Sequence, residues 1–307
     1  MRPRMREILD EQLRKIVAAG PALDLNAHLI MPFSAQVIHE FVGIPAADWD
    51  RMRTWSHRIR ERRKSYSTAS RSELRQYLYE LIERKKLCPA DDALSGVVRS
   101  VGSVGPDEQE EILRSVSGFP LTDFDVIGAR IAYGLLFLLG HRRQLKLLLD
   151  DRSLIPGAVE EALRLAVPGG SWIPRYALTD IDHANASIHA GDLVVFSMQS
   201  ANHDPEVFRE PGRFDITRTP NPHLAFGHGK FFCLGAHVSR AMLQVAFEGI
   251  LKRLPGLRLA VPPGEVRLED RRVTGGLHSL PAIWGLADDR QVPAIWGLAA
   301  ICRRSGA

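Results

Sequence analysis

The residues best suited to chemistry lie in the stretch 223–236, which surrounds one cysteine with glycines and aromatic side chains. Glycine permits a tight, irregular backbone, and Cys233 stands at the start of a strongly apolar helical pattern. At a helix N-terminus, the unpaired amide hydrogens and the helix dipole favour a thiolate over a thiol. A thiolate placed in this way is suited to bind one soft metal centre from one side.

Three interpretations of Cys233 follow from the residues alone. A lone cysteine is most often a buried apolar thiol. A zinc site would use His228, Cys233 and His237, although this spacing matches no common zinc finger and leaves the glycines unexplained. In the third interpretation, Cys233 is the axial ligand of a haem iron.

The spacing of the glycines around Cys233 resembles the haem-binding loop of the cytochrome P-450 superfamily. The pattern is Phe-Gly-x-Gly-x-x-x-Cys-x-Gly, and the matching residues are Phe226, Gly227, Gly229, Cys233 and Gly235. The resemblance implies that Cys233 ligates the iron of haem b and that the other four residues form the cofactor-binding loop.

Two upstream motifs extend the resemblance. Glu161 and Arg164 share one helix face, and by themselves they would form a surface ion pair of little worth. In the family this pair meets an arginine, here Arg213, in a buried network that locks the cysteine loop. Arg175 alone would be an exposed strand arginine, and the resemblance implies that it pairs with a haem propionate.

The chain also departs from the family pattern. Phe231 stands where bacterial members often have a histidine that contacts a propionate. The segment 122–126 aligns with the family's Ala-Gly-x-acid-Thr, which delivers protons to bound dioxygen. Asp125 can stand for the acid, but Val126 cannot donate a proton. Thr122, one turn earlier, is the candidate substitute, so Asp125 and Thr122 are the expected catalytic residues.

Helical periodicity predicts most of the elements that must position these residues. Met5, Leu9, Leu13 and Ile16 share the face of a first helix that stops at Gly20. Two further helices are expected to begin at Ser34 and after Pro45. Three more are expected over 108–139, 156–166 and 236–254, and the first of these three should break near Pro120. Extended runs are expected at 173–178, 186–189 and 193–196.

The expected fold is therefore mainly α with a small β region, and it is the cytochrome P-450 fold lacking its N-terminal portion. The resemblance extends from Arg2 to Trp284, and the family's N-terminal strands have no counterpart, so the chain resembles a member truncated at its N-terminus. Residues 1–284 are expected to form the haem domain. Residues 285–307 are expected to be an appended tail, because the heptapeptide at 281–287 recurs unchanged at 293–299.

Composition limits the partners. The 40 Lys and Arg residues against 36 Asp and Glu give a net charge of +4, which is too weak to indicate a nucleic-acid binder. No apolar run approaches the roughly 18 residues of a membrane span, and no apolar signal core follows the N-terminus. Three scattered cysteines do not form a disulfide framework. A cytoplasmic monomer is expected.

The resemblance implies a haem-thiolate monooxygenase. It would oxidise a small apolar or natural-product-like molecule with O2 and electrons from a ferredoxin-type donor, which Lys230 and Arg240 would dock unless they belong to a merely solvated surface. Two alternatives remain. The chain is a non-catalytic haem-binding remnant, or it couples or desaturates its substrate without the usual acid–alcohol pair.

Overall fold

The computed structural model describes residues 1–60, 64–101, 119–166, 172–183, 186–269 and 275–285. The first part of the helix expected over 108–139 and most of the expected tail lie outside the described residues. The first copy of the repeated heptapeptide begins within them, and its first three residues form a buried strand.

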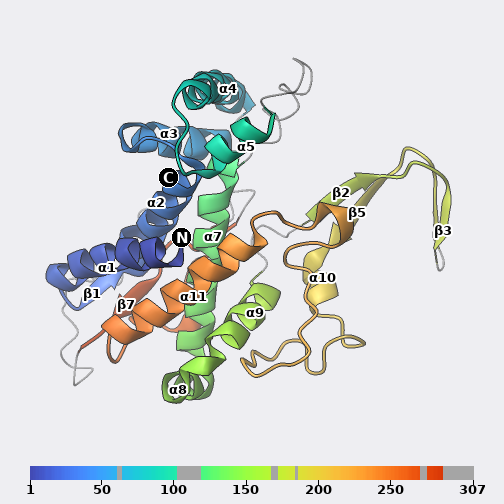
Figure 1. The fold of residues 1–307 in the computed structure, drawn as a ribbon. Coiled ribbons are helices and arrows are strands. Elements are labelled where there is room, and N and C mark those ends of the chain that lie inside the picture. Colours follow the sequence, from blue (N-terminus) through green and yellow to red (C-terminus); the bar gives the residue numbers. More distant parts are fainter. Residues whose placement is uncertain (61–63, 102–118, 167–171, 184–185, 270–274, 286–307) are drawn as a thin grey trace.

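Helices dominate the described chain, which confirms the expected mainly α architecture (Figure 1). They are α1 (Arg2–Ala19), α2 (Met31–Val42), α3 (Trp49–Arg60), α4 (Lys64–Leu87), α5 (Ala93–Val101), α7 (Phe119–Gly140), α8 (Arg142–Asp150), α9 (Ile155–Leu165), α10 (Met198–Asn202) and α11 (Ala236–Arg253). The strands are β1 (Ala22–Asp24), β2 (Trp172–Tyr176), β3 (Ile181–His183), β4 (Ala186–Ile188), β5 (Leu193–Ser197), β6 (Arg258–Leu259) and β7 (Pro281–Ile283).

Helix α7 runs through the middle of the helical body and packs against α2, α9 and α11 (Figure 1). Its close approach to two of these helices depends on Gly134. A Cβ atom at that position would collide with the ring of Phe247 on α11 and would lie 3.2 Å from the Cβ atom of Ala162 on α9. The glycine therefore allows α7 to pack closely against α9 and α11.

The predicted first helix is confirmed, with Met5, Leu9 and Leu13 buried against the core. The second helix begins at Met31, three residues before the predicted start, because a π-helical turn over Asn26–Ile30 runs directly into it. Asp24 starts that turn by accepting a hydrogen bond from the amide of Asn26 at 2.9 Å. An aspartate that accepts from the amide two residues further on favours a turn at that point.

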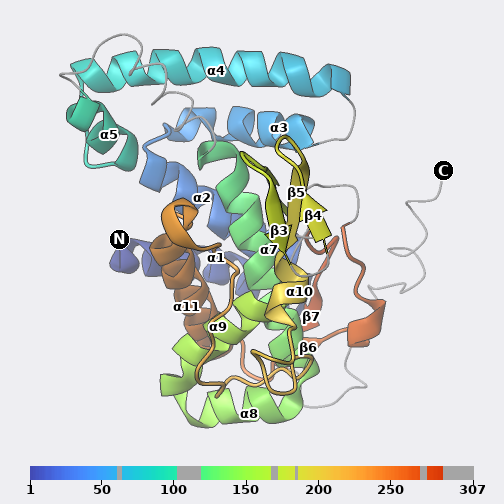
Figure 2. The same cartoon turned by 90° about the vertical axis from the view of Figure 1, so that its right-hand side faces the viewer.

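The β structure forms three small antiparallel sheets. One sheet has the order β1-β7-β6 and joins the two ends of the described chain, with Ala22 opposite Ile283. Strands β2 and β5 pair from Trp172–Ser197 to Tyr176–Leu193, and β3 pairs with β4. The β2–β5 ribbon projects away from the helical body in Figure 1 and lies in front of it in Figure 2, and it leaves Tyr176, Leu193 and Phe196 between 50% and 69% exposed.

Among the described helices, none has by itself the length and apolar run that crossing a bilayer requires. One pair, Phe124–Gly140 with Arg142–Asp150, meets the criterion only jointly, and it is bent by 101° at the break.

Candidate active site

The loop that carries Cys233 folds back on itself before α11 begins. Gly227 and Gly229 have φ values of +73° and +67°, a left-handed conformation that glycine adopts without strain. The amide of Cys233 donates to the carbonyl of Phe226 at 2.8 Å, which closes the loop. Gly235 is the N-cap of α11 with φ −79°, so its own backbone does not require glycine.

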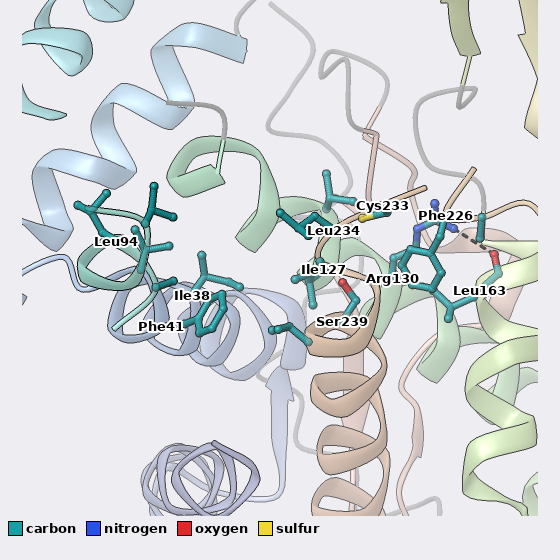
Figure 3. Close-up of a pocket in the computed structure, with 17 residues that line it drawn as sticks. Ile38, Phe41, Leu94, Ile127, Arg130, Leu163, Phe226, Cys233, Leu234 and Ser239 are labelled. Atoms are coloured by element: carbon teal, nitrogen blue, oxygen red, sulfur yellow. Dashed lines mark hydrogen bonds between the residues drawn. The ribbon is translucent and has the colours of Figure 1, made fainter. Parts of the chain in front are cut away.

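This loop forms one wall of a cavity of about 250 Å³ between α2, α5, α7 and α11 (Figure 3). Most of the lining is aliphatic or aromatic, and Cys233 contributes the sulfur. The described lining residues are Ile38, Phe41, Val42, Ala93, Leu94, Val97, Val126, Ile127, Arg130, Leu163, Ala225, Phe226, Cys233, Leu234, Gly235, Val238 and Ser239. Since Cys233 is exposed rather than buried, the interpretation as a buried apolar thiol is wrong.

The expected catalytic residues lie on α7. Asp125 is buried, with 8% of its surface exposed, and it is not among the described residues that line the cavity. Its neighbour Val126 does line the cavity. Thr122 belongs to the first turn of α7, but its side chain lies outside the described part of the structure.

Glu161 and Arg164 on α9 form a fully buried ion pair. Arg164 donates from Nε and Nη2 to the two carboxylate oxygens of Glu161, both at 2.8 Å, and neither side chain is exposed. The remaining donors of Arg164 reach three backbone carbonyls, those of Asn202, Pro211 and Arg213. All five guanidinium N–H groups are therefore used, which offsets the cost of burying the charge.

The prediction that the guanidinium of Arg213 completes this network is wrong. Arg213 donates instead to Glu210 at 2.9 Å, and its side chain is exposed. Its carbonyl faces the network, so its side chain points outward. Arg218 takes the predicted position, with Nε 3.2 Å from both oxygens of Glu161. Both arginines lie in one irregular segment, where no helical or strand periodicity shows which of them turns inward.

Asn202 joins this network to the cysteine loop, a role that the sequence did not reveal. Its side-chain amide donates to the carbonyl of Arg164 at 3.0 Å, and its side-chain oxygen accepts from the amide of Leu224 at 2.8 Å. Asn202 is completely buried. The buried ion pair is thus connected through one side chain to the start of the loop that presents Cys233.

A second charged network, also missed, holds the other side of the loop. Glu160 on α9 accepts from Nε2 of His223 at 3.0 Å and from Nε of Arg240 on α11 at 2.8 Å. The guanidinium of Arg240 lies over the ring of Phe226, 4.6 Å from its centroid. Arg240, whose side chain is 28% exposed, is thus held by Glu160, whereas Lys230 is exposed.

The Glu160 network gives a pH-dependent prediction. Burial alone would raise the pKa of Glu160, but hydrogen bonds from His223 and Arg240 lower that pKa to about 2. The stability that the carboxylate contributes is present above the ordinary glutamate pKa and is lost as the pH falls from about 4.5 towards 2. We expect Glu160→Gln to lower the free energy of unfolding at pH 7 by about 1–2 kcal/mol, after discounting for partial exposure.

Denaturant unfolding of both proteins between pH 7 and pH 3 measures this effect. The difference between wild type and Glu160→Gln should shrink as the pH falls below about 4.5. The control is Glu248→Gln, which removes a carboxylate from an exposed ion pair between α11 and Arg6 on α1. A difference for Glu160→Gln that stays constant over this pH range would contradict the assignment.

Arg175 on β2 lies against the cysteine loop. Its guanidinium is 4.9 Å from the centroid of the Phe231 ring, and its Nη1 donates to the carbonyl of Pro174. The side chain is exposed. The two positions that resemble propionate contacts, 175 and 231, are thus neighbours in space.

The zinc interpretation is wrong. His228, Cys233 and His237 all lie in the described part of the chain, and no group of three histidine, cysteine or acidic side chains among the described residues could hold a metal ion. What remains is the thiol of Cys233 on the wall of an apolar cavity, with the guanidinium of Arg175 against the same loop. This donor set fits a haem, which needs one axial sulfur, apolar contact with its ring, and cations for its carboxylates.

Comparison with known proteins identifies the family. A family model described as "Cytochrome P450" matches residues 140–279. Mycinamicin IV hydroxylase/epoxidase of Micromonospora griseorubida is 35% identical over 288 residues, which cover 92% of this chain and 72% of that enzyme. The chain belongs to the cytochrome P450 family.

Other similar proteins are bacterial enzymes with biosynthetic names. Pentalenolactone synthase of Streptomyces exfoliatus is 34% identical over 286 residues, covering 92% of this P450 and 71% of that protein. The crystal structure of the LnmA cytochrome P450 hydroxylase from the leinamycin biosynthetic pathway of Streptomyces atroolivaceus matches with a TM-score of 0.84 at 33% identity. That match covers 92% of this P450 and 74% of the hydroxylase chain. The class of enzyme is therefore a P450 monooxygenase.

Proposed function

We propose that this P450 holds haem b through Cys233 and oxidises a small, largely apolar organic molecule. The overall reaction consumes O2, two electrons and two protons; it inserts one oxygen atom into a C–H bond and releases the other as water. The observation that carries the proposal is the position of Cys233, which a hydrogen-bonded glycine loop presents to an apolar cavity below α7.

Each part of the chain has a role in this chemistry. When bound, haem supplies dioxygen activation, which a thiolate ligand favours by donating electron density. Phe226 and Leu234 line the cavity beside the sulfur, and with haem bound they would help to exclude water from the ligand. The two α9 networks hold the loop so that the sulfur keeps a fixed position.

The substrate class follows from the lining. Aliphatic side chains from α2, α5 and α7 offer few hydrogen-bonding groups, so binding depends mainly on the burial of apolar surface. The relatives named for mycinamicin IV and pentalenolactone are P450 proteins of bacterial biosynthesis. A natural-product-like molecule is accordingly the proposed substrate.

Proton delivery distinguishes two candidate reactions. Asp125 is the proposed acid and Thr122 the proposed alcohol. Val126 lines the cavity at the position where the family pattern has its alcohol, and a valine cannot hold or move a proton. This observation favours a second candidate, in which the substrate is coupled or desaturated without gaining oxygen.

The electron donor is proposed to be a small acidic ferredoxin. Lys230 is exposed within the cysteine loop, with its Nζ atom 5.1 Å from the centroid of the Phe231 ring. Such a cation near the ligand sulfur would steer an acidic partner towards the haem edge.

The test begins with purified protein supplied with hemin. We expect the reduced protein with carbon monoxide to give the Soret band of a thiolate-ligated haem. With a ferredoxin, its reductase and a panel of apolar natural products that includes mycinamicin IV, we expect substrate-dependent O2 consumption.

Mass spectrometry under 18O2 then separates the two reactions. A labelled product indicates oxygen insertion, and loss of two hydrogens without label indicates coupling or desaturation. A bound haem with no substrate-dependent O2 consumption by any panel member would instead indicate the non-catalytic haem-binding remnant. Protein that stays colourless with excess hemin would overturn the haem proposal.

A further inference from the structure

Arg130 is an unusual residue for the wall of an apolar cavity. It lies on α7, one turn after Val126, and it is 91% buried since only 9% of its surface is exposed. Among the described residues that line the cavity, Arg130 alone carries a permanently charged side chain. Desolvating a guanidinium is costly unless its charge and its N–H groups find partners.

The partners that the fold supplies satisfy only part of this group. Arg130 donates from Nη1 to the carbonyls of Leu163, at 3.1 Å, and Ala166. Both carbonyls belong to the C-terminal end of α9, where the helix dipole is negative. Both hydrogen bonds that Arg130 makes to described residues leave from this one nitrogen, so Nε and Nη2 stay available for another acceptor.

No carboxylate in the described part of the chain pairs with Arg130. Burial lowers the pKa of Arg130 to about 10, and the nearby Cys233 and Tyr133 raise it only partly. The group therefore stays protonated at neutral pH. In Figure 3 its guanidinium lies on the same side of the cavity as the Cys233 sulfur, with the Phe226 ring beside it.

We propose that Arg130 is an anion-recognition residue, which binds the carboxylate of a molecule held in this cavity. A guanidinium presents two parallel N–H groups that match a carboxylate, and the apolar walls strengthen that contact. Two molecules could bring the carboxylate: haem, through a propionate, or an acidic organic substrate. Only the first of these rests on the proposed haem function.

The variants separate the charge from the size of the side chain. Arg130→Met removes the charge but keeps a long side chain, and Arg130→Lys keeps the charge without the planar fork. Arg143→Met, which removes an exposed charge on α8, is the matched control. Circular dichroism and thermal unfolding of each variant report the loss of the α9 cap separately from ligand recognition.

The first arm compares hemin with hemin dimethyl ester, in which both propionates are masked, by absorbance titration of haem-free protein. If haem brings the carboxylate, wild type should prefer hemin, and Arg130→Met should lose about tenfold of that preference. The second arm compares decanoate with decan-1-ol by calorimetry on protein as purified, which does not require haem. If a substrate brings the carboxylate, wild type should bind decanoate more tightly than decan-1-ol, and Arg130→Met should reduce this ratio of affinities about tenfold.

In either arm, Arg130→Lys should retain part of the preference and Arg143→Met all of it. Unchanged preferences in both arms would overturn the proposal and leave Arg130 as a cap for α9, whatever the change in melting temperature. If wild type takes up neither porphyrin, the haem proposal fails, and the decanoate arm alone decides the role of Arg130.

Discussion

Replacing Cys233 with alanine is expected to abolish the thiolate-type Soret band of the reduced carbon monoxide complex. Cys233 lies on the cavity wall, and its backbone is held by the 2.8 Å hydrogen bond to Phe226. The substitution removes the sulfur that is the proposed ligand of the haem iron, while the backbone hydrogen bond that closes the loop does not depend on this side chain. Monooxygenase turnover should fall below detection when the thiolate-type Soret band is lost.

Cys88→Ala is the control for this change, since Cys88 is also exposed but lies just after the end of α4. Its spectrum and turnover should match wild type. A Cys233→Ala protein that keeps the thiolate-type band would refute Cys233 as the ligand. A wild-type pigment with an imidazole-type spectrum would do the same.

Replacing Arg164 with leucine is expected to prevent recovery of folded, pigmented protein. The change leaves Glu161 as a completely buried carboxylate that has lost its main counter-charge, with Arg218 on only one side. Breaking a buried ion pair in this way costs about 3–5 kcal/mol. A typical domain is stable by only about 5–15 kcal/mol, so the loss is a large fraction of the total. The yield of soluble protein and its haem content measure the effect.

Arg213→Ala and Arg218→Ala make the prediction specific. Arg213 is exposed, and among the described residues its side chain binds only Glu210, so its removal should change the free energy of unfolding by less than about 1 kcal/mol. Arg218 is 10% exposed and contacts Glu161, so its removal should lower yield and stability clearly. Equal damage from both variants, or normal yield and colour from Arg164→Leu, would contradict the network as the structure shows it.

The periodic helices were predictable because their burial repeats every three or four residues. The α1 face of Met5, Leu9 and Leu13 and the recurring apolar positions of α11 required no tertiary information. The cysteine loop was predictable for a different reason. Gly227 and Gly229 mark positions where the backbone has positive φ, and such glycines are visible in sequence.

The contacts between distant segments were not predictable. Asn202 links Arg164 to Leu224, and Glu160 links His223 to Arg240. Each joins three segments whose proximity depends on the packing of α9 and α11, and no local pattern records it. The prediction of Arg213 instead of Arg218 as the partner of Glu161 was wrong for a similar reason. Both arginines lie in one irregular segment, and the path of the chain alone decides which side chain points inward. Arg130 could not be predicted either, because the carbonyls that it binds, those of Leu163 and Ala166, belong to the distant end of α9.

The β2–β5 ribbon has a practical consequence for work with this chain. Within the described residues its two strands pair only with each other, and their faces carry exposed Tyr176, Leu193 and Phe196. An unpaired strand edge flanked by exposed apolar side chains can pair with strands of other molecules and so promote aggregation. Titrations at high protein concentration would therefore combine ligand binding with aggregation, so they are best carried out on dilute samples.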